Sequence, residues 1–144
     1  WTHLLLANTI GGVTDGSLRP VKYKSGITHP EAKLGGVFVA ATLDGQPLPK
    51  TLSPKSTGIK GLAVIQVSDA ALRGEVELND AGQQPLTPLR AAQIDRNMDD
   101  GRAGTGLVQA YGAPDCFGAG DFGYNEASKG QSCGLIFSIE PRVP

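Results

Sequence analysis

LTPLRAAQIDRNMDDG, residues 86–101, is the clearest helix signal in the chain. Thr87 is a preferred N-cap residue, and Pro88 suits the first helical position, where a missing N–H costs nothing. Apolar residues then recur at helical spacing, at Ala91, Ile94 and Met98. Gly101 stands where a C-terminal stop belongs. We therefore expect a helix over Thr87–Asp100.

Strand signals lie on both sides of this helix. The expected strands are Gly36–Leu43, Gly61–Ser68, Leu107–Tyr111 and Gly134–Glu140. Asp44-Gly45 marks a turn after the first strand, and the proline-containing segment Gln46–Lys60 is expected to be a loop. Glu75–Leu78 is either a short strand or part of a loop. The pattern predicts an α+β fold with an antiparallel sheet at its centre.

Composition and charge limit the kinds of protein that fit. The 144 residues suit a single domain over residues 1–144, and a hydrophobic content of 40% is enough to bury a core. Twenty glycines and ten prolines fit short strands joined by turns better than a helical bundle. With 13 basic and 14 acidic residues, the chain has no electrostatic footprint for nucleic acid, so we expect no such partner.

The amino-terminal end has the features of a helix end. Leu4, Leu5 and Ala7 give Trp1–Thr9 an apolar face, and Gly11-Gly12 would stop a helix there. No apolar run approaches the roughly 18 residues needed to span a bilayer. Whatever segment targets the protein is therefore expected to lie outside this sequence.

The chain has two cysteines, Cys116 and Cys133, with 16 residues between them. An even number of cysteines near the end of a small glycine-rich domain fits one disulfide, which implies an oxidising compartment. Two free buried thiols, or half of a metal site, are the alternatives. A zinc site would need two more ligands at short spacing, and His3 and His29 lie far away in the sequence.

Three carboxylates gather at the expected helix end: Asp95, Asp99 and Asp100. Asp95 and Asp99 are four residues apart and share a helix face. Negative charge in a last helical turn is unfavourable, so a partner is expected. Backbone amides of the Gly101–Gly106 turn, arginine side chains and a calcium ion are the three alternatives. We expect a structural turn motif made of Asp95, Asp99, Asp100 and Gly101, and no cofactor.

Aromatic residues cluster between the two cysteines: Phe117, Phe122 and Tyr124. Such residues on an exposed loop can bind sugars or partner proteins, and they can equally pin the loop to the body of the domain. The glycines at 118, 120 and 123 lack the strand and helix that a dinucleotide site needs. No nucleophile elbow is present, and His3 and His29, the two residues that could serve as imidazole bases, are interpreted as surface or packing residues. We therefore expect a protein that is not an enzyme.

Three stretches resemble prepilin-type proteins of Gram-negative bacteria. Trp1–Gly12 resembles the point where the long pilin helix enters the head. Leu86–Gly101, continuing to Val108, is similar to an Ile-Asp-x-Lys-x-Asp-Asp-Gly motif of minor pilin-like and type II secretion-like proteins, with Asn97 where the lysine is expected. The pair Cys116 and Cys133 resembles the carboxy-terminal disulfide loop of type IV pilins. Residues Val13–Leu86 carry no part of the resemblance.

The resemblance implies a pilin-like head, in which the end of an N-terminal helix packs on an antiparallel sheet and a disulfide closes a C-terminal loop. It implies a structural subunit, a minor pilin or pseudopilin, of a type IV pilus-like or type II secretion-like filament. Partners would be other such subunits, and the inner membrane through a helix preceding Trp1. The location would be the periplasmic face of that membrane or an extracellular filament. The loop with Phe117, Phe122 and Tyr124 would be a subunit contact.

A second hypothesis comes from a different class. The chain could be a free-standing periplasmic or secreted module that binds a ligand such as a carbohydrate through the aromatic loop. This hypothesis predicts a cleavable signal peptide and no retained apolar segment, which separates it from the filament subunit.

Overall fold

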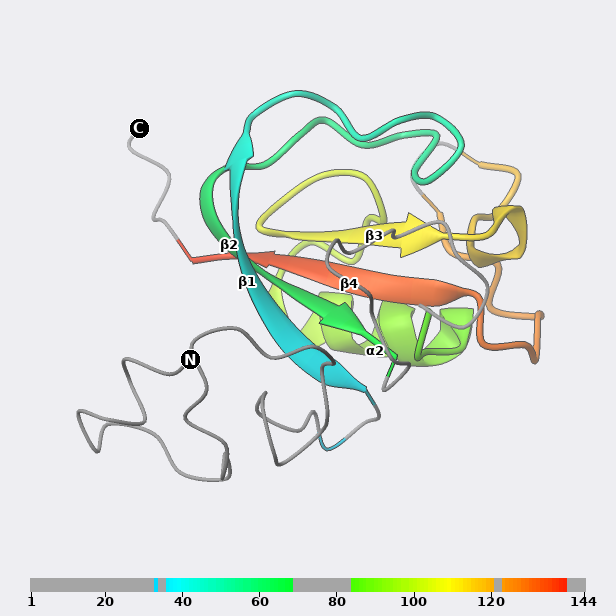
Figure 1. Cartoon of the computed structure of the whole chain (residues 1–144). Helices are drawn as coiled ribbons and strands as arrows, with labels where there is room; N and C mark the ends of the chain where they lie inside the picture. The colour runs from blue at the N-terminus through cyan, green and yellow to red at the C-terminus, as the bar shows by residue number, and fades with distance from the viewer. Residues whose placement is uncertain (1–32, 34–35, 69–83, 121–122, 140–144) are drawn as a thin grey trace.

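The computed structural model describes residue 33 and residues 36–68, 84–120 and 123–139 (Figure 1). In chain order the elements are β1 (Val37–Asp44), β2 (Lys60–Val67), α2 (Pro88–Met98), β3 (Val108–Gly112), the 3₁₀ turn η1 (Pro114–Cys116) and β4 (Cys133–Ser138). The fold is α+β: one helix packs on a four-stranded antiparallel sheet. The expected N-terminal helix at Trp1–Thr9 and the segment Glu75–Leu78 lie outside the described residues.

The sheet is assembled from segments that are distant in the sequence. Its strand order is β1-β2-β4-β3, so the last strand along the chain lies between β2 and β3. Ile65 of β2 pairs with Ile136 of β4, and Tyr111 of β3 pairs with Gly134 on the other side. The connection from β2 to β3 contains α2, which packs against β3 and β4 on one side of the sheet (Figure 1).

Both faces of β4 are buried, and each belongs to a different hydrophobic cluster. Leu135 lies in the cluster beneath α2, with Leu86, Ala91 and Ala110. Ile136 lies in a second cluster on the opposite face of the sheet. The other buried members of that cluster are Val37, Val39, Ile59, Ala63, Ile65, Val67 and Tyr111. Alternating side chains of a strand point to opposite faces, so a strand covered on both sides is apolar throughout.

The last strand ends earlier than predicted from the sequence. The sequence pattern predicts a strand that continues to Glu140. The strand ends at Ser138, and Ile139 is 52% exposed. The apolar character of Ile139 therefore does not reflect burial in the core.

The helix begins as expected and ends earlier than expected. Thr87 Oγ1 accepts a hydrogen bond from the Arg90 amide (3.4 Å), and proline occupies the first helical turn. The helix ends at Met98 rather than Asp100, and Met98 is 62% exposed, so it does not belong to the core face. The buried residues of α2 are Pro88, Ala91, Ala92 and Asp95. This spacing is helical, but its last member is a carboxylate instead of an apolar side chain.

The other boundaries agree with the expected elements to within one or two residues. β1 continues through Asp44, which pairs with Lys60, so the turn starts one residue later than expected, at Gly45. β2 correspondingly begins at Lys60 and ends at Val67. β3 starts at Val108 instead of Leu107 and ends at Gly112. Short runs of apolar residues between turn signals identified these strands, while their ends depend on pairing with distant segments.

The disulfide between Cys116 and Cys133 is present, with a Cα–Cα distance of 5.1 Å. Both cysteines are completely buried in the cluster beneath α2. Cys116 ends η1 and Cys133 begins β4, so the bond ties the exit of β3 to the start of the central strand. It thus closes the loop that separates the two neighbouring strands.

Removing the disulfide is expected to lower the free energy of unfolding by about 3 kcal/mol, because the unfolded chain regains the entropy of an open loop. The change is the double substitution Cys116→Ser and Cys133→Ser, and the measurement is urea denaturation monitored by circular dichroism. Wild-type protein in reductant, with reduction verified by mass spectrometry, should show the same loss. An unchanged transition midpoint in both samples would contradict the prediction.

Candidate functional site

The candidate site is the chain reversal that links the end of α2 to the start of β3. We call it the acidic corner and define it as Asp95, Asp99 and Asp100 with the turn 101–107. Asp95 lies on the buried face of α2 and has no exposed surface. Its Oδ1 accepts a hydrogen bond from the Gly101 amide (3.1 Å), and its Oδ2 accepts one from the Tyr124 hydroxyl (2.7 Å). One carboxylate therefore holds both the turn and the disulfide loop.

Asp99 connects the end of the helix to the sheet. Its Oδ2 accepts hydrogen bonds from the backbone amides of Leu107 and Val108, the latter at 3.0 Å. Gly106 lies directly against this carboxylate, because a Cβ at that position would be 1.7 Å from Asp99 Oδ2. Gly106 also has φ +81°, which disfavours other residues. A glycine is therefore required where β3 approaches the helix end.

Asp100 stabilises the turn from its exposed side. Its Oδ1 accepts a hydrogen bond from the Arg102 amide (2.9 Å), and its Oδ2 accepts one from the Thr105 hydroxyl (2.6 Å). Gly101, with φ +72°, reverses the chain between these contacts. The three carboxylates thus accept hydrogen bonds from the turn that follows the helix, which is the first of the three alternatives for offsetting their charge.

Burial controls the electrostatics of the corner. Desolvation raises the pKa of Asp95 above its ordinary value, while the hydrogen bonds from Tyr124 and Gly101 act in the opposite direction and the charges of Asp100 and Asp99 add to the rise. The pKa of the Tyr124 hydroxyl is raised, first by burial and then by its contact with Asp95. Tyr124 therefore remains a protonated donor, and the hydrogen bond to Asp95 persists across the physiological range.

A calcium ion at this place would compete with these hydrogen bonds. Oxygens of Asp95, Asp99 and Asp100 lie within 4.8 Å of one another, which is a spacing that a cation could bridge. Calcium takes six to eight oxygen ligands. At least five of the six carboxylate oxygens of the corner already accept hydrogen bonds from the protein. The arrangement is that of a hydrogen-bonded turn.

The aromatic residues of the disulfide loop face the body of the domain where the structure describes them. Tyr124 is only 8% exposed, and Phe117 is half-buried against the cluster beneath α2. The two form an isolated antiparallel bridge, and the Asn125 amide donates to the Cys116 carbonyl (3.0 Å). Phe122 lies outside the described residues. Tyr124 is thus a packing residue and offers no exposed ring to a sugar or a partner.

Gln109 is a structural residue that was not predicted from the sequence. Its side chain is completely buried in β3. Gln109 Oε1 accepts a hydrogen bond from the Ser56 hydroxyl (2.8 Å), and Nε2 donates to the Gly58 carbonyl (3.1 Å). It therefore attaches the long β1–β2 connection to the sheet. The available signal was a polar residue in the middle of an otherwise apolar strand.

A small pocket lies beneath the same connection. Its volume is about 170 Å³, and Leu43, Pro47, Leu48 and Pro49 are among the residues that line it. Small-molecule sites usually measure about 300–1,000 Å³. The amide of Gln109 lines the pocket, but its hydrogen bonds are made to the protein. The pocket is therefore a packing gap beside the loop. His3 and His29, the two histidines considered as bases, lie outside the described residues.

Asp95→Ala is expected to lower the free energy of unfolding by about 2–4 kcal/mol, because two donors lose their acceptor in a buried place. Asp95→Asn retains one acceptor oxygen and should cost less. Asp115→Ala is the matched control, since Asp115 is an exposed acidic residue and such changes stay within about 0.5 kcal/mol. Urea denaturation measures all three. Equal losses for Asp95→Ala and Asp115→Ala would show that the corner does not hold the fold.

Comparisons with known proteins assign the chain to no family. No protein-family model, no curated protein and no solved structure matches the chain. In the described ranges, no helix is both long enough and apolar enough to cross a bilayer.

Proposed function

We propose that the chain is the globular head of a filament subunit, a minor pilin or pseudopilin of a type IV pilus-like or type II secretion-like assembly. The observation that carries the proposal is the contact between Tyr124 and Asp95. Tyr124 belongs to the disulfide loop, and Asp95 belongs to the Ile-Asp motif, and these are two separate features that resemble prepilin-type proteins. The hydroxyl and the carboxylate are 2.7 Å apart in the buried interior. The disulfide loop and the Ile-Asp motif, two features that carry the resemblance, are thus in direct contact.

A structural role agrees with how the polar groups of the corner are used. The carboxylates of Asp95 and Asp99 bind backbone amides and a tyrosine hydroxyl that fix the chain. A general base needs a carboxylate that can reach a substrate, and Asp95 is buried. The proposal therefore assigns these residues to the rigidity of the head and assigns no catalysis to the chain.

The proposal also specifies partners and a location. Other subunits of the filament would contact the head, and a helix before Trp1 would anchor it in the inner membrane. The disulfide agrees with an oxidising compartment, the periplasm or the cell exterior. The contact surface within the loop 116–133 would consist of residues on its outer side, such as Lys129, because Tyr124 is buried.

The binding-module hypothesis receives no comparable support. It depends on exposed aromatic rings, and Tyr124 is buried while Phe117 is half-buried. The pocket beside Pro47 and Pro49 is small for a sugar ring with its hydroxyl groups.

Reading the coding sequence upstream of Trp1 tests the proposal. We expect a short basic leader followed directly by about 20 apolar residues, the length needed to span a bilayer as a helix. In cells of the source organism, an antibody against the head should then detect the protein in the membrane fraction and in sheared surface filaments or secretion-system filaments. A conventional cleavable signal peptide with no retained apolar segment would overturn the proposal and favour the binding module.

A further inference from the structure

The two edges of the sheet differ in how their outward backbone groups are used. At the β3 edge, the Val108 amide donates to Asp99 Oδ2 (3.0 Å), the Ala110 amide to the Ala103 carbonyl (2.7 Å), and the Gly112 amide to the Leu52 carbonyl (2.8 Å). This edge is therefore protected along its length. The other edge is β1, which pairs with β2 on its inner side. Within the described ranges, no strand pairs with the outer side of β1.

The ladder between β1 and β2 identifies the residues that point outward. The Gly45 amide donates to the Ile59 carbonyl (3.0 Å), and this pair continues the register of the two strands. Hydrogen-bonded and non-hydrogen-bonded pairs alternate along an antiparallel ladder. The odd-numbered residues of β1 therefore bond to β2. The backbone groups of Ala40, Thr42 and Asp44 face the outer edge, and all three residues are exposed.

This part of the edge lacks the features that usually prevent strand pairing. Proteins protect free edges with charged side chains, prolines or bulges. The segment Ala40–Leu43 contains neither charge nor proline, and the charged Asp44 stands only at its end. The pairing of this segment with residues 61–64 of β2 is regular. An unprotected row of amides and carbonyls selects another extended strand as its partner.

We propose that the outer edge of β1 pairs antiparallel with β1 of a second copy of the chain, about a two-fold axis that places Thr42 opposite Thr42 of the second copy. In this register the three exposed outward residues are all used, since Ala40 lies opposite Asp44 of the second copy. Ala41 and Leu43, whose backbone groups bond to β2 and whose side chains are half-buried, also lie opposite each other across the axis, so apolar side chains meet. Apolar cross-strand neighbours and paired threonines both stabilise a sheet.

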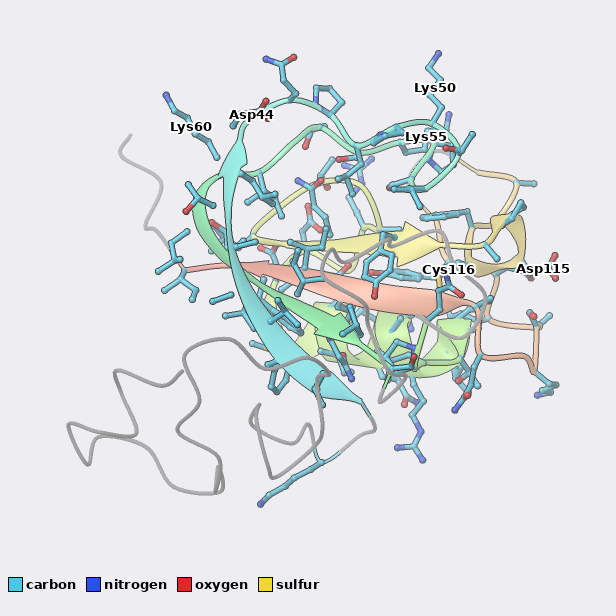
Figure 2. The ribbon with its side chains drawn as sticks, in the orientation of Figure 1. Asp44, Lys50, Lys55, Lys60, Asp115 and Cys116 are labelled. Carbon is cyan, nitrogen blue, oxygen red and sulfur yellow. A yellow bond between two sulfur atoms is a disulfide. The ribbon has the colours of Figure 1, made fainter. Side chains whose placement is uncertain are left out.

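The distribution of charge favours this register. The two Asp44 residues lie at opposite ends of the paired segment, so no like charges are opposed. Each Asp44 also has Lys60 as its neighbour on β2, and the two residues project together at one end of the sheet (Figure 2). A two-fold pair closes on itself, whereas a filament needs open head-to-tail contacts. The pairing is therefore independent of the proposed function, and either can fail alone.

Sedimentation equilibrium of the whole chain, from low micromolar to near-millimolar concentration, tests the pairing. We expect a dimer whose fraction rises with concentration. Thr42→Lys places two lysines opposite each other, and Thr42→Pro removes an outward N–H that β2 does not use, so each should weaken dimerisation by about tenfold or more. Thr51→Lys, an exposed lysine in the β1–β2 connection, is the matched control and should dimerise like wild type.

The variants also test whether β1 is the surface involved. Thr42 is exposed, so circular dichroism and thermal unfolding should show that Thr42→Lys folds like wild type. A wild-type chain that stays monomeric at all concentrations would overturn the proposal. So would a Thr42→Lys variant that dimerises as strongly as Thr51→Lys.

Cross-linking tests the register. Under mild oxidation, Thr42→Cys should form a disulfide-linked dimer much faster than Thr51→Cys, because only the first places two thiols opposite each other within disulfide reach. Equal rates for the two variants would contradict the two-fold arrangement.

Discussion

The hydrogen bonds of two buried or half-buried carboxylates, Asp95 and Asp99, are the constraint on which the rest of the structure depends. Asp95 joins α2 to the turn and to the disulfide loop, and Asp99 joins the helix end to the first amides of β3. Without these hydrogen bonds, the negative charge at the end of the helix would lie uncompensated beside the helix carbonyls, which is unfavourable. Because amides of the turn and of β3 donate to these carboxylates, the carboxylates connect the helix to the sheet.

The sheet topology makes this connection necessary. β4 lies between β2 and β3, although it comes last in the chain. The chain between α2 and Cys133 therefore has to position β3 so that β4 can insert between β2 and β3. The acidic corner fixes the start of β3, and the Cys116–Cys133 bond fixes the distance between its end and the start of β4. The β3 edge is covered as a consequence, whereas no strand of the described residues pairs with the outer edge of β1.

Local patterns predicted most of the elements but little of the site. Thr87 and Pro88 located the helix start because a cap depends on its immediate neighbours. The four strands were predicted from short runs of apolar residues between turn signals. The strand order did not follow, because pairing joins segments far apart in the sequence. The Asp95–Tyr124 contact was missed for the same reason, since 29 positions separate the two residues. Met98 was misplaced because an apolar residue at helical spacing need not face the core.

Hydrogen exchange of the Leu107 and Val108 amides, followed by NMR, tests most directly whether the acidic corner holds the fold together. We expect both amides, and the hydrogen-bonded Ala110 amide within β3, to exchange slowly in the wild-type protein. In Asp99→Ala the Leu107 and Val108 amides should exchange quickly while Ile136, in the central strand, stays protected. Wild-type amides at 107 and 108 that exchange as quickly as that of the exposed Lys129 would contradict the account.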